Sequence, residues 1–126
     1  MVIGVGKGYN IRRLMRVKIS KLFKAGLNEE ADEEVSEFGW TPKELVSHLC
    51  LNGVTREEII NKRTIYHIDH IIPLYVFEDP FCFYANSLDN LQLLHKDDHA
   101  LKAKLESSLI NHVRNLRKKN TVQKYT

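Results

Sequence analysis

The sequence has no long apolar run and few cysteines. A membrane-spanning helix needs about 20 consecutive apolar residues, and the chain of 126 residues contains no such run. The N-terminus has no apolar signal core and turns basic by Lys7. The two cysteines, Cys50 and Cys82, are too few and too far apart for a disulfide framework or a Cys-x-x-Cys zinc site. We therefore expect a chain without a membrane span, in a reducing, cytoplasmic setting.

Nucleotide-binding motifs and internal repeats are absent as well. Gly4, Gly6 and Gly8 follow no strand, and no Gly-Lys-Ser or Gly-Lys-Thr comes after them, so they form neither a dinucleotide fingerprint nor a phosphate-binding loop. The length is that of one domain. A hydrophobic content of 43% with 28% charged residues is ordinary for a globular chain. This composition argues against a wholly disordered chain, a collagen or a coiled-coil rod.

What the sequence does contain is a strong segregation of charge behind a net charge of only +3. Residues 1–26 hold seven basic residues and no acidic one, whereas residues 28–44 hold seven acidic residues and one basic residue. Residues 96–126 hold eight basic residues against three acidic ones. Two basic ends therefore flank an acidic middle. This pattern suits binding to a polyanion such as nucleic acid, but it also fits two solvated helix faces.

Hydrophobic spacing and capping patterns predict a mixed α+β chain. Thr41-Pro42-Lys43-Glu44 and Thr55-Arg56-Glu57-Glu58 are both typical of a capping box at a helix start. The expected order is a helix over 10–25, an acidic linker or exposed helix over 27–39, helices over 41–51 and 55–62, a strand over 65–72, a loop over 74–87, a short strand over 91–94, and a long amphipathic helix over 97–118.

Four polar residues occupy positions in this order where they could converge. Asp69 and His70 lie late in the first strand, Asn90 lies at the start of the second, and His99 lies in the first turn of the last helix. A carboxylate and an imidazole are good ligands for one divalent ion. A neighbouring histidine that is not a ligand can take a proton from water near neutral pH. Metal and general base together are the minimum for phosphodiester hydrolysis.

The motifs around these residues resemble those of HNH endonucleases. Asp-His-Ile-Ile-Pro stands at 69–73, Asn-Leu-Gln at 90–92 and His-Ala-Leu-Lys at 99–102. The stretch from Gly39 to Leu49, Gly-Trp-Thr-Pro-Lys-Glu-Leu-Val-Ser-His-Leu, is similar to one found upstream in small phage-type HNH nucleases. The resemblance extends over about residues 39–105, roughly two-thirds of the chain.

The resemblance implies an α+β fold with a ββα-metal (His-Me finger) core and flanking helices. Many HNH domains also hold a structural zinc in two Cys-x-x-Cys pairs, which this chain lacks, so we expect no zinc knuckle and a core held by packing. We divide the chain into a basic N-terminal helix with an acidic linker at 1–38, and a nuclease domain at 39–126 that ends in a long basic helix.

The resemblance also implies the role of each motif residue. His70 would be the general base that activates the attacking water, and Asn90 would orient it through the loop backbone. Asp69 and His99 would hold one divalent metal ion, Mg²⁺ or Mn²⁺. Lys102 matches the lysine of the family and is expected to contact DNA phosphate. In a regular strand Asp69 and His70 would face opposite sides, so both reach one site only if the strand distorts or ends there.

The expected function is that of a metal-dependent DNA endonuclease, nicking or cutting both strands and leaving 5′-phosphate and 3′-hydroxyl ends, in a bacterial or phage-infected host cell. Further DNA phosphate contacts are expected from the basic ends, at Arg12, Arg13, Arg16, Arg114, Arg117, Lys118 and Lys119. The alternatives are a non-catalytic DNA-binding or phage assembly factor on an HNH scaffold, and an RNase. A chain with one site cuts both strands of a duplex only by forming a homodimer or by acting twice, and both options stay open.

Overall fold

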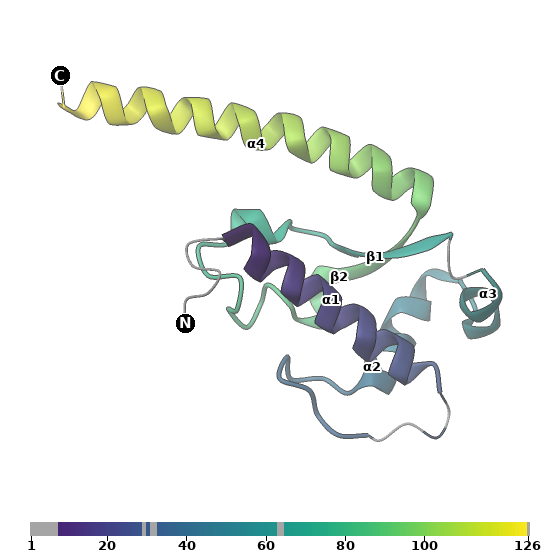
Figure 1. The fold of residues 1–126 in the computed structure, drawn as a ribbon. Coiled ribbons are helices and arrows are strands. Elements are labelled where there is room, and N and C mark those ends of the chain that lie inside the picture. The colour runs from purple at the N-terminus through teal and green to yellow at the C-terminus, as the bar shows by residue number, and fades with distance from the viewer. Residues whose placement is uncertain (1–7, 29, 31–32, 63–64, 126) are drawn as a thin grey trace.

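The described part of the chain folds as an α+β protein of four α-helices and one small sheet, which confirms the predicted class (Figure 1). A computed structural model describes residues 8–28, 30, 33–62 and 65–125. The elements in chain order are α1 (Gly8–Gly26), α2 (Pro42–Leu49), α3 (Arg56–Asn61), β1 (Tyr66–His70), β2 (Leu91–His95) and α4 (Lys96–Tyr125), with short 3₁₀ turns at Cys50–Asn52, Leu74–Val76 and Leu88–Asn90.

The N-terminal helix α1 forms part of the hydrophobic core. Ile19 and Phe23 are buried in one cluster with Trp40, Leu45 and residues of β2. Gly26, at the end of α1, lies so close to α2 that a Cβ atom there would stand 2.3 Å from the carbonyl oxygen of Pro42. The basic helix therefore shares its core with the part of the chain that carries Asp69, His70, Asn90 and His99. The division at residue 38 stays a prediction.

The helices α2 and α3 begin where the capping patterns predict. The Thr41 side chain accepts a hydrogen bond from the backbone N–H of Glu44, and the Glu44 carboxylate accepts one from the backbone N–H of Thr41, which completes the capping box. Thr55 caps α3 through the backbone N–H of Glu58. In its described residues, the segment 27–39 holds turns, bends and irregular chain, so these residues form a linker rather than a helix.

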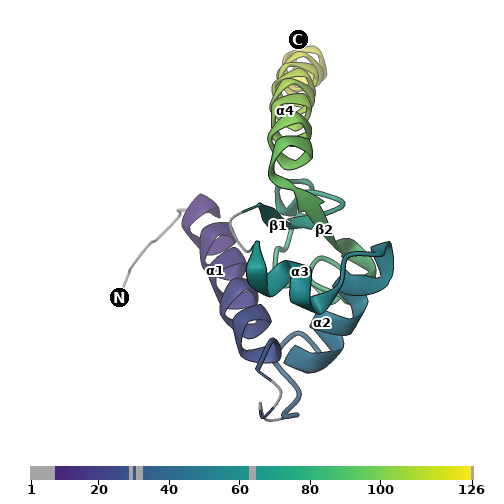
Figure 2. The same cartoon turned by 90° about the vertical axis from the view of Figure 1, so that its right-hand side faces the viewer.

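The sheet is a single antiparallel pair of β1 and β2 (Figure 2). Its register sets Tyr66 opposite His95 and His70 opposite Leu91. Beyond His70 the backbone N–H of Ile72 donates to the Asn90 side chain instead of to a ladder partner. The first strand therefore ends at His70, earlier than the predicted residue 72.

The last helix, α4, leaves the end of β2 and runs back over β1, and its C-terminal part projects beyond the body of the molecule (Figure 1). It ends at Tyr125 rather than near 118. The predicted apolar stripe is largely exposed to solvent: Leu101, Leu105 and Leu109 are 57–63% exposed. Among the described residues, no helix has the length and apolar character needed to cross a bilayer.

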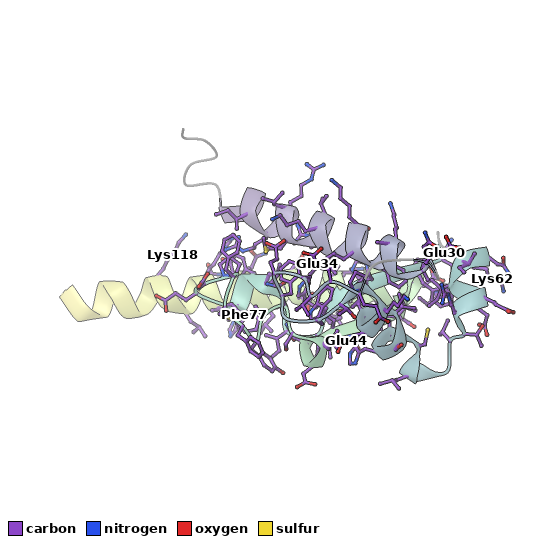
Figure 3. All side chains as sticks on the ribbon, turned by 90° about the horizontal axis from the view of Figure 1, so that it is seen from below. Glu30, Glu34, Glu44, Lys62, Phe77 and Lys118 are labelled. Carbon is purple, nitrogen blue, oxygen red and sulfur yellow. The ribbon has the colours of Figure 1, made fainter. Side chains whose placement is uncertain are left out.

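The acidic linker and the basic end of α4 lie apart in space. Glu30 of the acidic linker and Lys118 of α4 lie at opposite ends of the molecule (Figure 3). Two of the basic residues near the linker form ion pairs with it, Lys18 with Glu37 at 3.1 Å and Lys43 with Glu33 at 3.6 Å. The acidic linker thus neutralises nearby cations, while the basic end of α4 lies away from it.

Candidate active site

The motif residues meet where β1 ends against β2 and α4. A small open cleft of about 210 Å³ lies there. Its lining includes Arg16 from α1, Asp69 and His70 from β1, and His99 and Glu106 from α4. The fourth motif residue, Asn90, is fully buried beside the turn that follows His70. The structure therefore brings together all four residues on which the sequence hypothesis depends.

Asp69 and His70 do point to different neighbours, as strand geometry requires. Asp69 faces α4, while the ring of His70 contacts Asn86 in the loop between the strands. Both side chains nevertheless line the same cleft, because β1 ends at His70 and leaves its end open.

A buried amide fixes the ring of His70. The Nε2 atom of His70 lies 2.9 Å from Oδ1 of Asn86, and the Nδ2 group of Asn86 donates to the carbonyl oxygen of Pro80 at 2.8 Å. Since Nδ2 is the donor to Pro80, Oδ1 is the acceptor, and the proton of the neutral imidazole stands on Nε2. The lone pair is then on Nδ1. A further bond, from Nε1 of Trp40 to the backbone oxygen of Asn86, holds this residue in place.

The surroundings of His70 favour the neutral imidazole. Its pKa is lowered from 6.5, chiefly because burial disfavours the charged form. The hydrogen bond to Asn86 and the charge of Asp69 act in the opposite direction, whereas Arg16 and Lys102 lower the pKa further. A neutral ring with a free Nδ1 lone pair is the form that can accept a proton from water.

Asn90 ties the turn after β1 to the rest of the site. Its Oδ1 atom accepts from the backbone N–H of Ile72 at 2.7 Å, and its Nδ2 group donates to the carbonyl oxygens of Ile72 at 3.1 Å and Ala85 at 2.8 Å. All three partners are backbone groups, so Asn90 fixes the path of the loop between β1 and β2 near both of its ends. This is the contact pattern that the sequence hypothesis requires of it.

Asp69 and His99 have a separation that fits two ligands of one metal ion. Oδ1 of Asp69 lies 3.7 Å from Nε2 of His99. Two ligands at about 2.1 Å from one Mg²⁺ ion stand at most about 4.2 Å apart. The Nδ1 atom of His99 contacts Nδ1 of His67 at 3.1 Å, which leaves Nε2 directed at the carboxylate. The described residues contain no larger cluster of metal-binding side chains, and water and phosphate oxygens would complete the coordination.

Lys102 is half-buried and contacts other residues of the site. Its Nζ atom lies 3.1 Å from Oδ2 of Asp69, donates to the backbone oxygen of His70 at 3.0 Å, and pairs with Glu106 one turn along α4. Gln92 donates a second hydrogen bond to Asp69, at 2.9 Å. The lysine therefore offsets the charge of two carboxylates beside the cleft. Its contact with DNA phosphate stays a prediction.

Two of the predicted DNA-binding arginines meet on one tyrosine. The guanidinium groups of Arg12 and Arg114 lie 4.9 and 5.0 Å from the ring centre of Tyr75, and Nε of Arg114 lies 2.5 Å from its hydroxyl oxygen. Neither arginine forms an ion pair with the part of the chain that the structure describes. Arg12 of α1 and Arg114 of α4 therefore form one cationic surface around this ring, and we call these two arginines the Tyr75 cation pair.

The remaining predicted contacts are less defined. Arg13 is exposed on α1, and Lys118 is exposed near the free end of α4 (Figure 3). Arg117 and Lys119 belong to α4, but their side chains lie outside the described residues.

Sequence reasoning did not identify Asn86 or Tyr75. The partners of Asn86 come from β1, from the loop and from the far side of the core at Trp40, and no local spacing signals such a convergence. Tyr75 follows the Asp-His-Ile-Ile-Pro motif closely, and an aromatic residue at this place in a chain with two basic ends was the only signal available in the sequence.

No protein-family model matches the chain, and neither does any curated protein or any solved structure. The resemblance to HNH endonucleases therefore rests on the residues of the motif and on the geometry given above.

Proposed function

We propose that the chain is a metal-dependent HNH endonuclease that hydrolyses DNA on a ββα-metal core formed by β1, β2 and α4. The observation that carries the proposal is the meeting of Asp69, His70 and His99 at one cleft, above a buried Asn90 that bonds only to the backbone of the catalytic loop. A binding protein needs neither a buried neutral histidine nor a carboxylate and an imidazole at metal-ligand separation.

His70 is the general base of this proposal. Its Nδ1 lone pair takes the proton of a water molecule, and the resulting hydroxide attacks the phosphorus atom of the scissile diester. The bond from phosphorus to the 3′ oxygen then breaks, and the 3′ oxygen takes a proton from a solvent water molecule, giving a 5′-phosphate and a 3′-hydroxyl end. The hydrogen bond from Nε2 of His70 to Asn86 keeps the imidazole in the required orientation and stabilises the imidazolium that forms.

Asp69 and His99 would hold the divalent ion, Mg²⁺ or Mn²⁺. When bound there, such an ion supplies positive charge to the phosphate and to the departing 3′ oxygen. Gln92 orients the carboxylate of Asp69 from the neighbouring strand, and His67 contacts the imidazole of His99 from the same strand as Asp69. Such secondary partners hold metal ligands in place before the metal binds.

Cationic side chains around the cleft would hold the DNA backbone. Arg16 lines the cleft itself and also lines a larger groove of about 540 Å³ between α1 and β1, together with Lys24, His67 and His99. The groove leads from the exposed face of α1 to the site of cleavage. A phosphate backbone in it would be neutralised by residues of α1, and the Tyr75 cation pair would add contacts farther along.

Cleavage of supercoiled plasmid tests the proposal. Wild-type protein with Mg²⁺ or Mn²⁺ should convert the plasmid to nicked or linear DNA, and addition of EDTA should stop the reaction. His70→Ala should lose cleavage while it still binds DNA. His95→Ala is the matched control, because His95 is a half-buried histidine of the same sheet that does not line the cleft, and this variant should cut as the wild type does.

The same assay separates the alternatives. DNA binding without cleavage, across several divalent metals, would indicate a non-catalytic DNA-binding or phage assembly factor and contradict the proposal. Parallel reactions on duplex DNA, single-stranded DNA and RNA would identify an RNase by selective loss of the RNA.

A further inference from the structure

The exposed side of α4 carries a continuous apolar seam. Leu101, Leu105, Leu109 and Leu116 are 57%, 63%, 59% and 45% exposed, and with His112 they recur every three or four residues. This spacing places them along one face of the helix. The face that packs on the body is a different one, which includes Lys102 and Glu106. The seam is therefore a face of α4 that lies apart from the face with which the helix packs on the body.

The seam continues into an apolar groove beside it. Leu109 also lines a groove of about 390 Å³ between α4 and residues 71–76. Ile71, Ile72 and Val76, in this segment, are 44%, 36% and 57% exposed. Soluble monomers rarely expose contiguous apolar surface of this kind, and such surface usually marks an interface.

The charges of α4 indicate what covers the seam. The first turn of the helix holds Asp97 and Asp98 against Lys96, a net charge of −1, whereas residues 114–119 hold four basic residues and no acidic one. A second copy of α4 in antiparallel orientation would set the acidic start of each helix beside the basic end of the other, and the two helix dipoles would also oppose. Parallel copies would bring like charges together at both ends.

We propose that two copies of the chain pair through α4, antiparallel about a two-fold axis near Ser108 and Leu109. In this register Leu101 of one copy faces Leu116 of the other, and Leu105 faces His112. The seam from Leu101 to Leu116 is about 23 Å long at 1.5 Å per residue. A seam of this length gives an interface at the small end of the range, so we expect a weak dimer that dissociates on dilution.

Sedimentation velocity of the full chain, without DNA or metal, tests the pairing. Wild type should shift from monomer to twice the monomer mass between low and several hundred micromolar concentration. Leu105→Glu and Leu109→Glu should weaken association by more than about tenfold, because each sets a carboxylate in the apolar seam. Leu51→Glu is the matched control, since Leu51 is 78% exposed but far from α4 in the sequence and on another element, and it should dimerise normally.

Cysteine cross-linking tests the orientation. In a Cys50→Ser, Cys82→Ser background, Ser108→Cys should form a disulfide with its copy, because the axis passes beside it. Leu101→Cys should not, because the two copies of that position are about 23 Å apart in the antiparallel dimer. A disulfide at Leu101→Cys would show parallel pairing and overturn the proposed register.

Three results would contradict the dimer itself. Wild type could stay monomeric at every concentration, or Leu51→Glu could disrupt association as much as Leu105→Glu does. Alternatively, Leu105→Glu could leave the mass unchanged and abolish DNA binding, which would make the seam a DNA contact. None of these outcomes depends on nuclease activity, so the dimer and the proposed function fail separately.

The dimer has a consequence for strand cleavage that rests on the proposed function. Two copies present two His70 sites related by a two-fold axis, and the two strands of a duplex are related in the same way. Leu105→Glu should then still nick plasmid DNA but yield a smaller share of linear product than the wild type. An unchanged ratio of linear to nicked product would contradict this link.

Discussion

The imidazole of His70 and the amide of Asn86 are joined by a buried hydrogen bond of 2.9 Å between Nε2 and Oδ1. The two residues are 8% and 2% exposed. Because the other end of the same amide donates to Pro80, Asn86 can only accept from His70, and it therefore determines which ring nitrogen is free. Asn86 is in this respect a positioning residue for the proposed base.

Substitution of Asn86 should change the pH dependence of cleavage and not only its rate. Asn86→Asp keeps an acceptor for Nε2 but adds a negative charge, which raises the pKa of His70 and moves the acid limb of the rate profile to higher pH. Asn86→Leu removes the acceptor and should lower the rate about 10- to 100-fold at all pH values. Ser87→Ala is the control. An unchanged profile for Asn86→Asp would show that Asn86 is only structural.

The lowered pKa of His70 predicts how the cleavage rate and the stability change in mild acid. A base works in its neutral form, so the cleavage rate should be full above the pKa of His70 and fall only below 6.5, the ordinary value for histidine. Since the unfolded chain takes up this proton more readily than the folded chain, the free energy of unfolding should also decrease as the pH falls below that value. Asp69, Arg16 and Lys102 are the charged groups that act on His70 here.

Chemical unfolding of wild type and His70→Gln between about pH 7 and about pH 5 measures this effect. The variant should lose less stability over the interval than the wild type does. Equal losses would mean that the folded state does not disfavour the protonated form of His70.

Asn90→Ala should destabilise the fold. The side chain is fully buried, and its removal leaves the N–H and carbonyl groups of Ile72 and the carbonyl of Ala85 without their partner. We expect a loss of about 3 kcal/mol in the free energy of unfolding, which lowers Tm by about 10 °C. Asp89→Ala, at the neighbouring exposed position, should change Tm little. A Tm for Asn90→Ala equal to that of Asp89→Ala would refute the assigned role.

The Tyr75 cation pair predicts a specific salt dependence of DNA binding. Each phosphate contact contributes about −0.9 to the slope of log K against log salt. The double variant Arg12→Ala, Arg114→Ala should therefore bind more weakly and with a slope shallower by about 1 to about 2. Lys18→Ala is the control. Lys18 lies on the same helix as Arg12, but its ammonium group already pairs with Glu37 at 3.1 Å, so this variant should have the slope of the wild type. Equal slopes for all three proteins would show that DNA does not contact the Tyr75 cation pair.

Local signals in the sequence predicted the elements well. The Thr41 and Glu44 pair marks the start of α2 to the residue, because the capping box is made by neighbours in the chain. The strand that holds Asp69 and His70 was also predicted, but its end was set two residues too late. The reason is a non-local contact, since the Asn90 side chain takes the backbone N–H of Ile72.

Features that depend on distant parts of the chain were not predictable in the same way. The spacing of Leu101, Leu105 and Leu109 identifies an apolar helix face but cannot say whether the chain itself covers it, and the structure leaves it exposed. The pairing of Lys102 with Asp69 likewise depends on how α4 crosses β1. The residue types and their order therefore indicated which side chains meet at the candidate site. The hydrogen bonds between these side chains could be seen only in the folded structure.

The central claim is that His70 is the base of a nuclease, and the most direct test is the single-turnover cleavage rate of His70→Ala relative to the wild type with Mg²⁺ or Mn²⁺ present. DNA affinity is measured on the same samples, so that loss of binding is not mistaken for loss of chemistry. We predict an unchanged Kd with a rate lower by about 10²- to 10⁴-fold, the usual contribution of a general base. Cleavage by His70→Ala at the wild-type rate would contradict the account.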